Sequence, residues 1–262
     1  MKKKAGERVG AGGKKTAVPI NFPLPPEDLL SEGLKKLEIP EHNQDFGKIT
    51  VNGRETLGSL FEAYLKELVL FNSVFNLIGA DTDSAQGRSD LVVRHILDAL
   101  SPWRILAEKA NDMYTDASFS DPVRIADAGS GAGIPGIPLA ILFPGIRFTL
   151  IERMSRRCTF LENCAALLGL ENVTVLNTEL EKAPGKMFDF TVFRAFRPLD
   201  ASMLKILTAT IKPRGMLAAY KARINAIREE MSGVEALLKE WNAVPLQVPF
   251  LEHEERFLVL MR

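Results

Sequence analysis

The spacing of apolar residues predicts a helical first part of the chain. Between residues 57 and 69, apolar side chains recur every three or four positions, which is the spacing of one face of an α-helix. Two shorter helices are predicted over about residues 27–38 and over residues 91–100, and the second stops before Pro102. We therefore expect the first 110 or so residues to be entirely helical, within a helical part that spans residues 27–120.

From about Val123 onward, short apolar runs alternate with helical patterns. Each run is rich in Val, Ile, Phe and Thr, as strands buried on both faces are. The runs are VRIADAG (123–129), RFTLIER (147–153), NVTVLN (172–177) and FDFTVFRA (188–195). Helical patterns at residues 155–169 and 198–212 separate them, and this alternation predicts a parallel sheet covered by helices on both faces.

The end of the chain predicts three more strands. A fifth strand is expected near residues 215–220, followed by a helix over about residues 224–241. Two strands close in sequence, residues 243–250 and 256–261, should pair as an antiparallel hairpin at the end of the sheet. The predicted fold class is therefore α/β: a mostly parallel, seven-stranded, doubly wound sheet over residues 121–262, with an N-terminal helical extension.

Composition indicates a globular protein with one unusual end. The 262 residues are 46% hydrophobic and 25% charged, which is typical of a globular chain and not of a collagenous or disordered one. Residues 1–26 are rich in Lys and Gly and then in Pro, so we expect a disordered tail there. The formal net charge is zero, because an acidic remainder balances the basic tail. This balance neither supports nor excludes a nucleic-acid partner, since binding depends on how charge is distributed over the surface.

Several features favour a reduced, cytoplasmic protein without a metal site. The most apolar segment, residues 136–146, contains prolines and is shorter than the roughly 18 apolar residues of a membrane-spanning helix. A secretory signal would require an apolar run after its basic N-terminal region, and this sequence has none there. Cys158 and Cys164 lie in one predicted helix, where a disulfide between them is geometrically implausible. His95 lies within an apolar helix, so we expect it to be a core or interface histidine.

The most informative segment is the glycine-rich loop that follows the first predicted strand, which ends at Asp127. The loop glycines are Gly129, Gly131, Gly133 and Gly136. Glycines let the backbone turn with positive φ and let a ligand approach without a Cβ in the way. The last three also fit the dinucleotide fingerprint, and Glu152 lies where an acid would bind ribose hydroxyls. An NAD(P)-dependent oxidoreductase is therefore one candidate.

Asp127 and Pro135 favour S-adenosylmethionine over a dinucleotide. A pyrophosphate would bind free N–H groups at the start of the following helix, but Pro135 has none. Asp127 would also repel it, because a like charge at about 5 Å costs on the order of 3 kcal/mol at an effective dielectric near 20. S-adenosylmethionine has a sulfonium, an ammonium and a ribose but no phosphate. If neither acid binds a ligand, Asp127 is a helix cap or loop anchor and Glu152 is a solvated strand end.

The same loop and four other segments resemble a known family. They are FNLIGA (75–80), RHILDAL (94–100), DAGSGAGIPGIPLAI (127–141), LIERMSRRCTFLENCAALLGLENVTVLN (150–177) and FRAFRPL (193–199). Together they resemble the bacterial small-subunit ribosomal RNA methyltransferase G family, also called glucose-inhibited division protein B. The resemblance extends from about Thr56 to Arg228, and the repeated Gly-Ile-Pro steps are far more specific than a bare glycine pattern.

The resemblance implies a class I, Rossmann-like methyltransferase that transfers a methyl group from S-adenosyl-L-methionine to N7 of a guanine in 16S rRNA, the 530-loop guanine. Its partner would be 16S rRNA or the assembling small ribosomal subunit, and the protein would be a monomer.

Gly129 and Ile134 match cofactor-contacting positions of the family's loop, and Leu180 and Glu181 match the pair after the third strand. Arg194 matches the arginine after the fourth strand. It is the candidate catalytic residue, because a guanidinium can bind guanine O6, a phosphate or the cofactor carboxylate. The candidate cofactor-binding set is Asp127, Gly129, Gly131, Gly133, Ile134, Glu152, Leu180, Glu181 and Arg194.

Some alternatives stay open. From the residues alone, Glu181 would be a solvated loop charge, and Arg194 would equally be structural. A non-catalytic RNA-binding ribosome-assembly factor is a further alternative to an enzyme. The chain departs from the family pattern at Phe193, Arg197 and Ala222, and these positions bear on the pocket for the target base. Basic side chains near strand ends are candidates for an RNA-facing edge: Arg153, Arg156, Arg157, Arg197, Lys212, Arg214, Lys221 and Arg223.

Overall fold

The computed structural model describes residues 22–75, 77–79, 81–82, 84–114, 121–195 and 197–262. The tail expected to be disordered, residues 1–26, lies outside this part of the chain except for residues 22–26.

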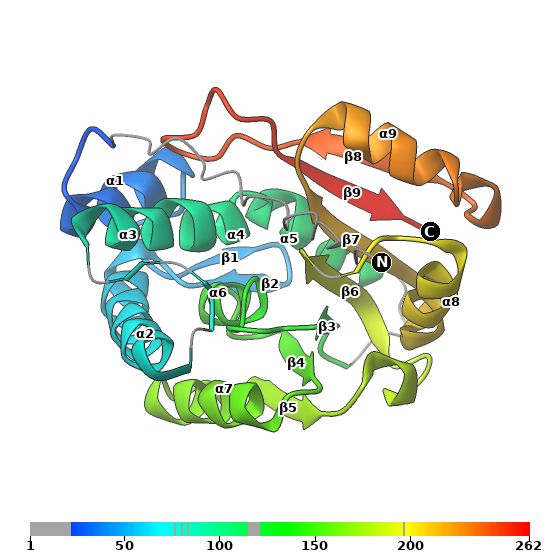
Figure 1. Cartoon of the computed structure of the whole chain (residues 1–262), viewed down its shortest axis with the longest axis horizontal. Coiled ribbons are helices and arrows are strands. Elements are labelled where there is room, and N and C mark those ends of the chain that lie inside the picture. The colour runs from blue at the N-terminus through cyan, green and yellow to red at the C-terminus, as the bar shows by residue number, and fades with distance from the viewer. Residues whose placement is uncertain (1–21, 76, 80, 83, 115–120, 196) are drawn as a thin grey trace, which may run out of the picture.

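A seven-stranded sheet forms the C-terminal part of the molecule (Figure 1). Its strands lie in the order β5-β4-β3-β6-β7-β9-β8. Strands β3 to β7 run parallel, whereas β9 pairs antiparallel with both β7 and β8. The strands are β3 (Arg124–Ala128), β4 (Arg147–Glu152), β5 (Val173–Asn177), β6 (Phe188–Arg194), β7 (Ile211–Lys221), β8 (Trp241–Pro245) and β9 (Phe257–Met261). The predicted α/β class, with a mostly parallel sheet and a terminal antiparallel hairpin, is confirmed.

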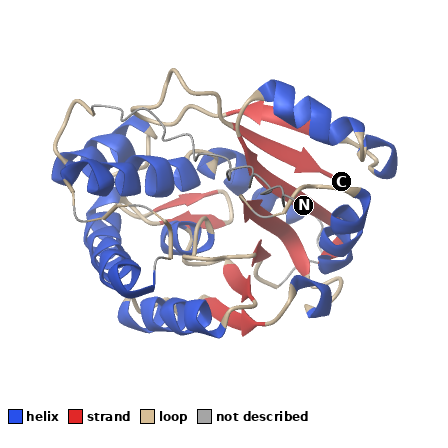
Figure 2. Ribbon diagram, viewed as in Figure 1, coloured by secondary structure: helices blue, strands red, loops and turns tan. Residues whose placement is uncertain are grey.

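Helices cover both faces of this sheet (Figures 1 and 2). They are α6 (Gly136–Leu142), α7 (Ser155–Leu167), α8 (Ala201–Thr210) and α9 (Ile224–Ser232), with short 3-10 turns η2 (Leu180–Lys182) and η3 (Glu235–Leu237). Successive side chains of a strand point to opposite faces. Ile125 of β3 therefore lies in the core with α6 and α7, and Ala126 lies in the core with α8 and α9.

The N-terminal helices pack on the same face as α6 (Figure 1). They are α1 (Pro26–Lys36), α2 (Arg54–Phe75), α3 (Ala85–Asp90), the π-helical segment η1 (Leu91–Leu97), α4 (Asp98–Leu100) and α5 (Trp103–Met113). Two buried hydroxyls connect this part to the sheet: Tyr64 donates to the Ala132 carbonyl at 2.5 Å, and Tyr220 donates to the Ala99 carbonyl at 2.9 Å. None of the helices in the described ranges has the length and apolar character needed to span a bilayer.

The expectation of an entirely helical first part is wrong at residues 44–51, which form a hairpin. Its strands are β1 (Gln44–Phe46) and β2 (Ile49–Val51). Three-residue strands are too short to produce a recognisable period of two in the sequence. Gly47 turns between them with φ of 67°, and Asn111 of α5 fixes the turn by donating to the Phe46 carbonyl.

The C-terminal elements are also shorter than predicted. Helix α9 ends at Ser232 rather than near residue 241; the short turn η3 follows it, and β8 begins at Trp241. The first strand of the terminal hairpin ends at Pro245 rather than at residue 250. Pro249 has no N–H to donate to a longer ladder.

Candidate functional site

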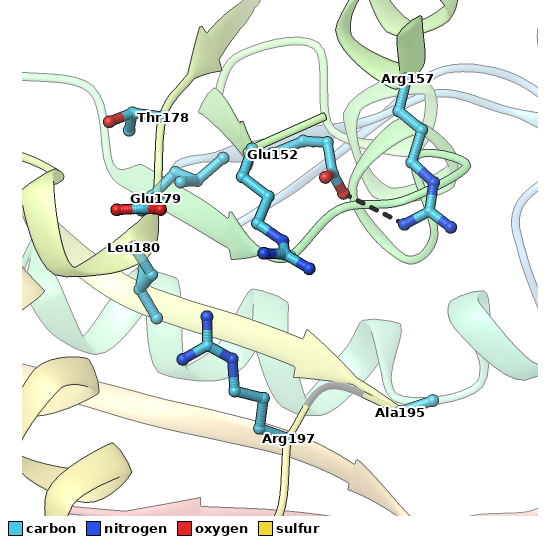
Figure 3. Close-up of a pocket in the computed structure, with 10 residues that line it drawn as sticks. Glu152, Arg157, Thr178, Glu179, Leu180, Ala195 and Arg197 are labelled. Atoms are coloured by element: carbon cyan, nitrogen blue, oxygen red, sulfur yellow. Dashed lines mark ion pairs between the residues drawn. The ribbon is translucent and has the colours of Figure 1, made fainter. Parts of the chain in front are cut away.

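A cavity opens at the carboxyl ends of β3, β4 and β5, the edge of an open α/β sheet where ligands bind (Figure 3). We call it the first cavity; its volume is about 230 Å³. Its walls are the ends of the strands and the loops that follow them. They include Gly129, Glu152, Arg153, Arg157, Thr178, Glu179, Leu180 and Arg197.

A larger second cavity, of about 670 Å³, lies beside the first at the ends of β6 and β7. Ala195 and Arg197, which follow β6, border both cavities. The helical N-terminal part and the terminal hairpin complete the walls of the second cavity. They contribute Arg94, His95, Asp98, Leu246, Arg256 and Phe257. The two cavities therefore meet at Ala195 and Arg197.

Asp127 lies inside the glycine loop and does not border either cavity. Its side chain is buried, and Oδ2 accepts hydrogen bonds from the Ser130 hydroxyl at 2.7 Å and from the Gly136 N–H at 3.0 Å. Gly136 is the first residue of α6, so the carboxylate joins the strand end to the start of the helix. This is the loop-anchor arrangement that the sequence left open, and we assign Asp127 to holding the loop.

Stability is expected to depend on the ionisation of Asp127. Burial raises the pKa of this carboxyl to about 6, against the lowering effect of its hydrogen bonds from Ser130 and Gly136. Because its folded-state pKa lies above its unfolded value, the stabilisation is complete below about pH 4 and is lost as pH rises through 6. The pKa difference of about 2 corresponds to roughly 3 kcal/mol.

An asparagine side chain at this position would not titrate, so the unfolding free energy of wild type minus that of Asp127→Asn should fall by about 3 kcal/mol between pH 4 and pH 7. Urea unfolding at both pH values measures it, and a pH-independent difference would contradict the assignment.

Glu152 ends β4 and borders the first cavity, although its side chain is only 4% exposed (Figure 3). Oε2 accepts a hydrogen bond from the Gly131 N–H at 3.0 Å, and Oε1 accepts one from the Met154 N–H at 2.9 Å. Arg157 approaches Oε2 at 3.6 Å. Each carboxylate oxygen can accept more than one hydrogen bond, so Glu152 keeps acceptor capacity for hydroxyl groups of a ligand. It is therefore not a solvated strand end.

Of the other predicted loop residues, Gly129 borders the first cavity, and the rest hold the loop in shape behind it. Gly129 borders the first cavity with φ of 72°, a conformation that favours glycine. The N–H groups of Gly133 and Ile134 donate to the Ser130 carbonyl, and neither residue borders the cavity. Gly131 acts through its N–H on Glu152.

The connection after β5 supplies one wall of the first cavity. Leu180 is buried and borders the cavity. Glu181 does not border it, but forms an ion pair at 2.7 Å with Arg197, which does. Thr178 and Glu179 also line the cavity and were missed from the sequence. Their position just after a predicted strand was the available signal.

Arg194 ends β6 and borders the second cavity, not the first. Its guanidinium is held by the helical N-terminal part. Nη1 donates to Asp98 Oδ2 at 2.7 Å and to the Arg94 carbonyl at 3.0 Å, and Nη2 donates to His95 Nδ1 at 2.8 Å. Burial raises the pKa of Asp98, against the lowering effect of Arg194 and Arg256. The partners of Arg194 lie about a hundred residues away in sequence, and sequence reasoning did not find them.

The predicted basic edge is only partly assembled at the cavities. Arg153, Arg157 and Arg197 border the first cavity, and Lys221 and Arg223 border the second. Lys212 is not part of this edge, because it binds Asp189 at the start of β6, at the opposite end of the strand. In the described ranges, no three His, Cys, Asp or Glu side chains gather as a metal ion would need.

Two of the three departures from the family pattern lie at the second cavity. Arg197 and Ala222 border it. Phe193 instead points into the core with α8 and α9, where it is 2% exposed. This departure from the family pattern therefore affects packing behind β6.

Known proteins resemble this chain over most of its length. A family model described as rRNA small subunit methyltransferase G matches residues 58–259. The chain belongs to this family. It is 38% identical over 253 residues to the ribosomal RNA small subunit methyltransferase G of Treponema denticola, which covers 88% of this chain and 93% of that protein. The protein of the same name from Polynucleobacter asymbioticus is 31% identical, over 88% of this chain and 96% of that protein.

Among solved structures, a SAM-dependent methyltransferase from Aquifex aeolicus superposes on 63% of this chain and 91% of its own, with a TM-score of 0.47 and 19% identity. The family assignment rests on the sequence relatives. As a member of the family, the chain is a methyltransferase with S-adenosylmethionine as its cofactor. The alternatives of an NAD(P)-dependent oxidoreductase and of a non-catalytic assembly factor are therefore set aside.

Proposed function

We propose that this chain transfers the methyl group of S-adenosylmethionine to N7 of a guanine in 16S rRNA, the 530-loop guanine. The names of its relatives support a ribosomal RNA substrate. The observation that carries the proposal is the pair of adjacent cavities that meet at Ala195 and Arg197. One has the groups that a nucleoside cofactor needs, and the other has the arginine-rich walls that a guanine in an RNA strand needs.

The first cavity fits S-adenosylmethionine by its chemistry. Glu152 has acceptor capacity for the ribose hydroxyls, and Leu180 offers an apolar wall to the adenine ring. Gly129 lets the backbone approach without a side chain. Pro135 at the start of α6 leaves no N–H there for a phosphate, which this cofactor lacks. The cofactor supplies a methyl group on a positively charged sulfur.

The second cavity would hold the acceptor base. N7 of guanine has an in-plane lone pair and no proton, so methylation at N7 requires no general base. The chain must instead position the base and exclude water, and such alignment is worth about 7 to 11 kcal/mol. Arg194 is suited to this task because three hydrogen bonds fix its guanidinium at the cavity wall.

The rim of both cavities is suited to an RNA backbone. Arg153 and Arg197 are exposed at the first cavity, and Arg223 is exposed at the second. Basic side chains at such positions bind phosphates and set the register of the strand. The partner proposed is 16S rRNA or the assembling small subunit, which would place the reaction in the cytoplasm.

Transfer of labelled methyl from S-adenosylmethionine tests the proposal. The acceptors are naked 16S rRNA and small ribosomal subunits from a bacterial strain that lacks this activity, and cleavage at N7-methylguanine maps the product. We expect one labelled guanine in at least one of the two acceptors. Label at a position other than guanine N7, or no label in either acceptor by protein that binds the cofactor, would contradict the proposal.

A further inference from the structure

The hydrogen bond between Arg194 and His95 fixes the tautomer of the histidine. Arg194 Nη2 lies 2.8 Å from His95 Nδ1. A guanidinium has only donors and stays protonated in proteins, so Nδ1 must be the acceptor and carry no proton. Burial, then the charges of Arg194 and Arg94, lower the pKa of His95 to about 3. At neutral pH the ring is therefore neutral, with its single N–H at Nε2.

The Nε2–H group is a donor at the wall of the second cavity. His95 borders this cavity, and no hydrogen bond joins its Nε2 to any residue in the described ranges. Nε2 is not among the buried donors without a partner, so it is accessible to solvent. A ligand atom in the cavity that accepts a hydrogen bond could therefore take the place of water on this donor.

The position of His95 relates this donor to the reacting atom. His95 contacts Arg194, the last residue of β6, and the two cavities meet at the next residues of the chain, Ala195 and Arg197. A guanine whose N7 faces the first cavity presents O6 beside it, because both acceptors lie on the same edge of the base. Adenine presents its N6 amino group, a donor, at the same place.

We propose that the Nε2–H of His95 donates a hydrogen bond to O6 of the target guanine and so selects guanine over adenine, an assignment that rests on the proposed function. Against adenine, the same N–H would face an amino group, and both donors would stay unpaired. Sites built around one hydrogen bond reject the wrong partner more strongly than sites built on shape alone. His95 would thus be a residue that determines which base is accepted as the methyl acceptor.

The test compares two RNAs that differ only in the target base. One is 16S rRNA assembled by ligation with guanine at the mapped position, and the other carries 2-aminopurine there, which keeps N7 but has hydrogen in place of O6 and no proton on N1. Both are offered as naked rRNA and in reconstituted subunits. Wild type is expected to have a kcat/KM roughly 10- to 100-fold lower on the 2-aminopurine RNA. His95→Leu also removes the acceptor for Arg194 and so should slow both RNAs, but it should slow the guanine RNA by a similar factor more than the other.

The ratio of the two rates separates recognition of O6 from a structural role. Loss of the contact between residue 95 and Arg194 would slow both RNAs equally and leave the ratio as in wild type. His95→Gln, whose amide can accept from Arg194 and donate to O6, should restore part of the ratio. Arg223→Gln, at the rim of the same cavity, should lower both rates and leave the ratio unchanged. Binding of S-adenosylmethionine by each variant confirms that it folds.

The outcomes distinguish this proposal from the function on which it rests. If the ratio of the rates on the guanine and 2-aminopurine RNAs were the same in wild type and His95→Leu, the assignment of His95 would be overturned. Equal rates of wild type on the two RNAs would overturn it as well. Failure of wild type to methylate either RNA would overturn the proposed function, and the assignment of His95 with it.

Discussion

Replacing Arg194 with alanine is expected to lower both catalytic efficiency and stability by large amounts. Transfer to RNA should fall by about 10²- to 10³-fold, the usual effect of removing one well-placed donor from an active site. The free energy of unfolding should fall by about 3–5 kcal/mol, because removing one partner leaves the Asp98 carboxylate inside the protein without its nearest cation. Arg256, at 3.5 Å, would remain close to this carboxylate, and the charge of Arg94 also acts on it.

Urea unfolding and labelled-methyl transfer measure the two effects of Arg194→Ala. The matched control is Arg197→Ala, which breaks an ion pair whose side chains are 43% and 37% exposed. Exposed pairs contribute at most about 1 kcal/mol, so the control should unfold close to wild type. The double variant Arg194→Ala/Asp98→Ala should recover part of the lost stability. An Arg194→Ala protein within about 1 kcal/mol of wild type would show that Asp98 is neutral or solvated.

Glu152→Ala should weaken binding of S-adenosylmethionine by at least about 100-fold. The substitution removes the acceptor for the ribose hydroxyls, and each hydrogen bond to a charged group contributes about 1.5–3 kcal/mol. It also leaves the N–H groups of Gly131 and Met154 without their partner, so the loop loses the bond that shapes it.

Isothermal titration calorimetry of the cofactor measures this loss. Glu152→Gln keeps one side-chain carbonyl oxygen and should fall between the alanine variant and wild type. Glu162→Ala, an exposed glutamate of α7 away from the first cavity, should bind as wild type does. Unchanged affinity in Glu152→Ala would mean that the cofactor lies elsewhere in the fold.

The cofactor side of the site was more accessible to sequence reasoning than the acceptor side. Gly129, Glu152 and Leu180 all follow or end predicted strands, and parallel strands bring their carboxyl ends to one edge. Local spacing was therefore sufficient to place them together. Asp127 shows the limit of this reasoning, because spacing gave its position at the strand end but not the direction of its side chain.

The acceptor side depends on contacts that no local spacing encodes. Arg194 was identified through the family resemblance, but its partners His95 and Asp98 lie in a separate helical segment. The apolar pattern of that segment predicted that it is helical and which of its faces is buried. It did not predict which strand end the helix packs against. Phe193 was expected to bear on the base pocket, yet strand alternation turns it toward the opposite core.

The bonds from Arg194 to η1 and α4 have a consequence for engineering. A chimaera that joined residues 27–120 of one family member to residues 121–262 of another would inherit a complete first cavity from a single parent. The wall of its second cavity would come from two parents, with Arg194 from one and the three residues that bind it from the other. Libraries aimed at a new target base should therefore randomise both halves together, since neither half by itself defines the shape that the base meets.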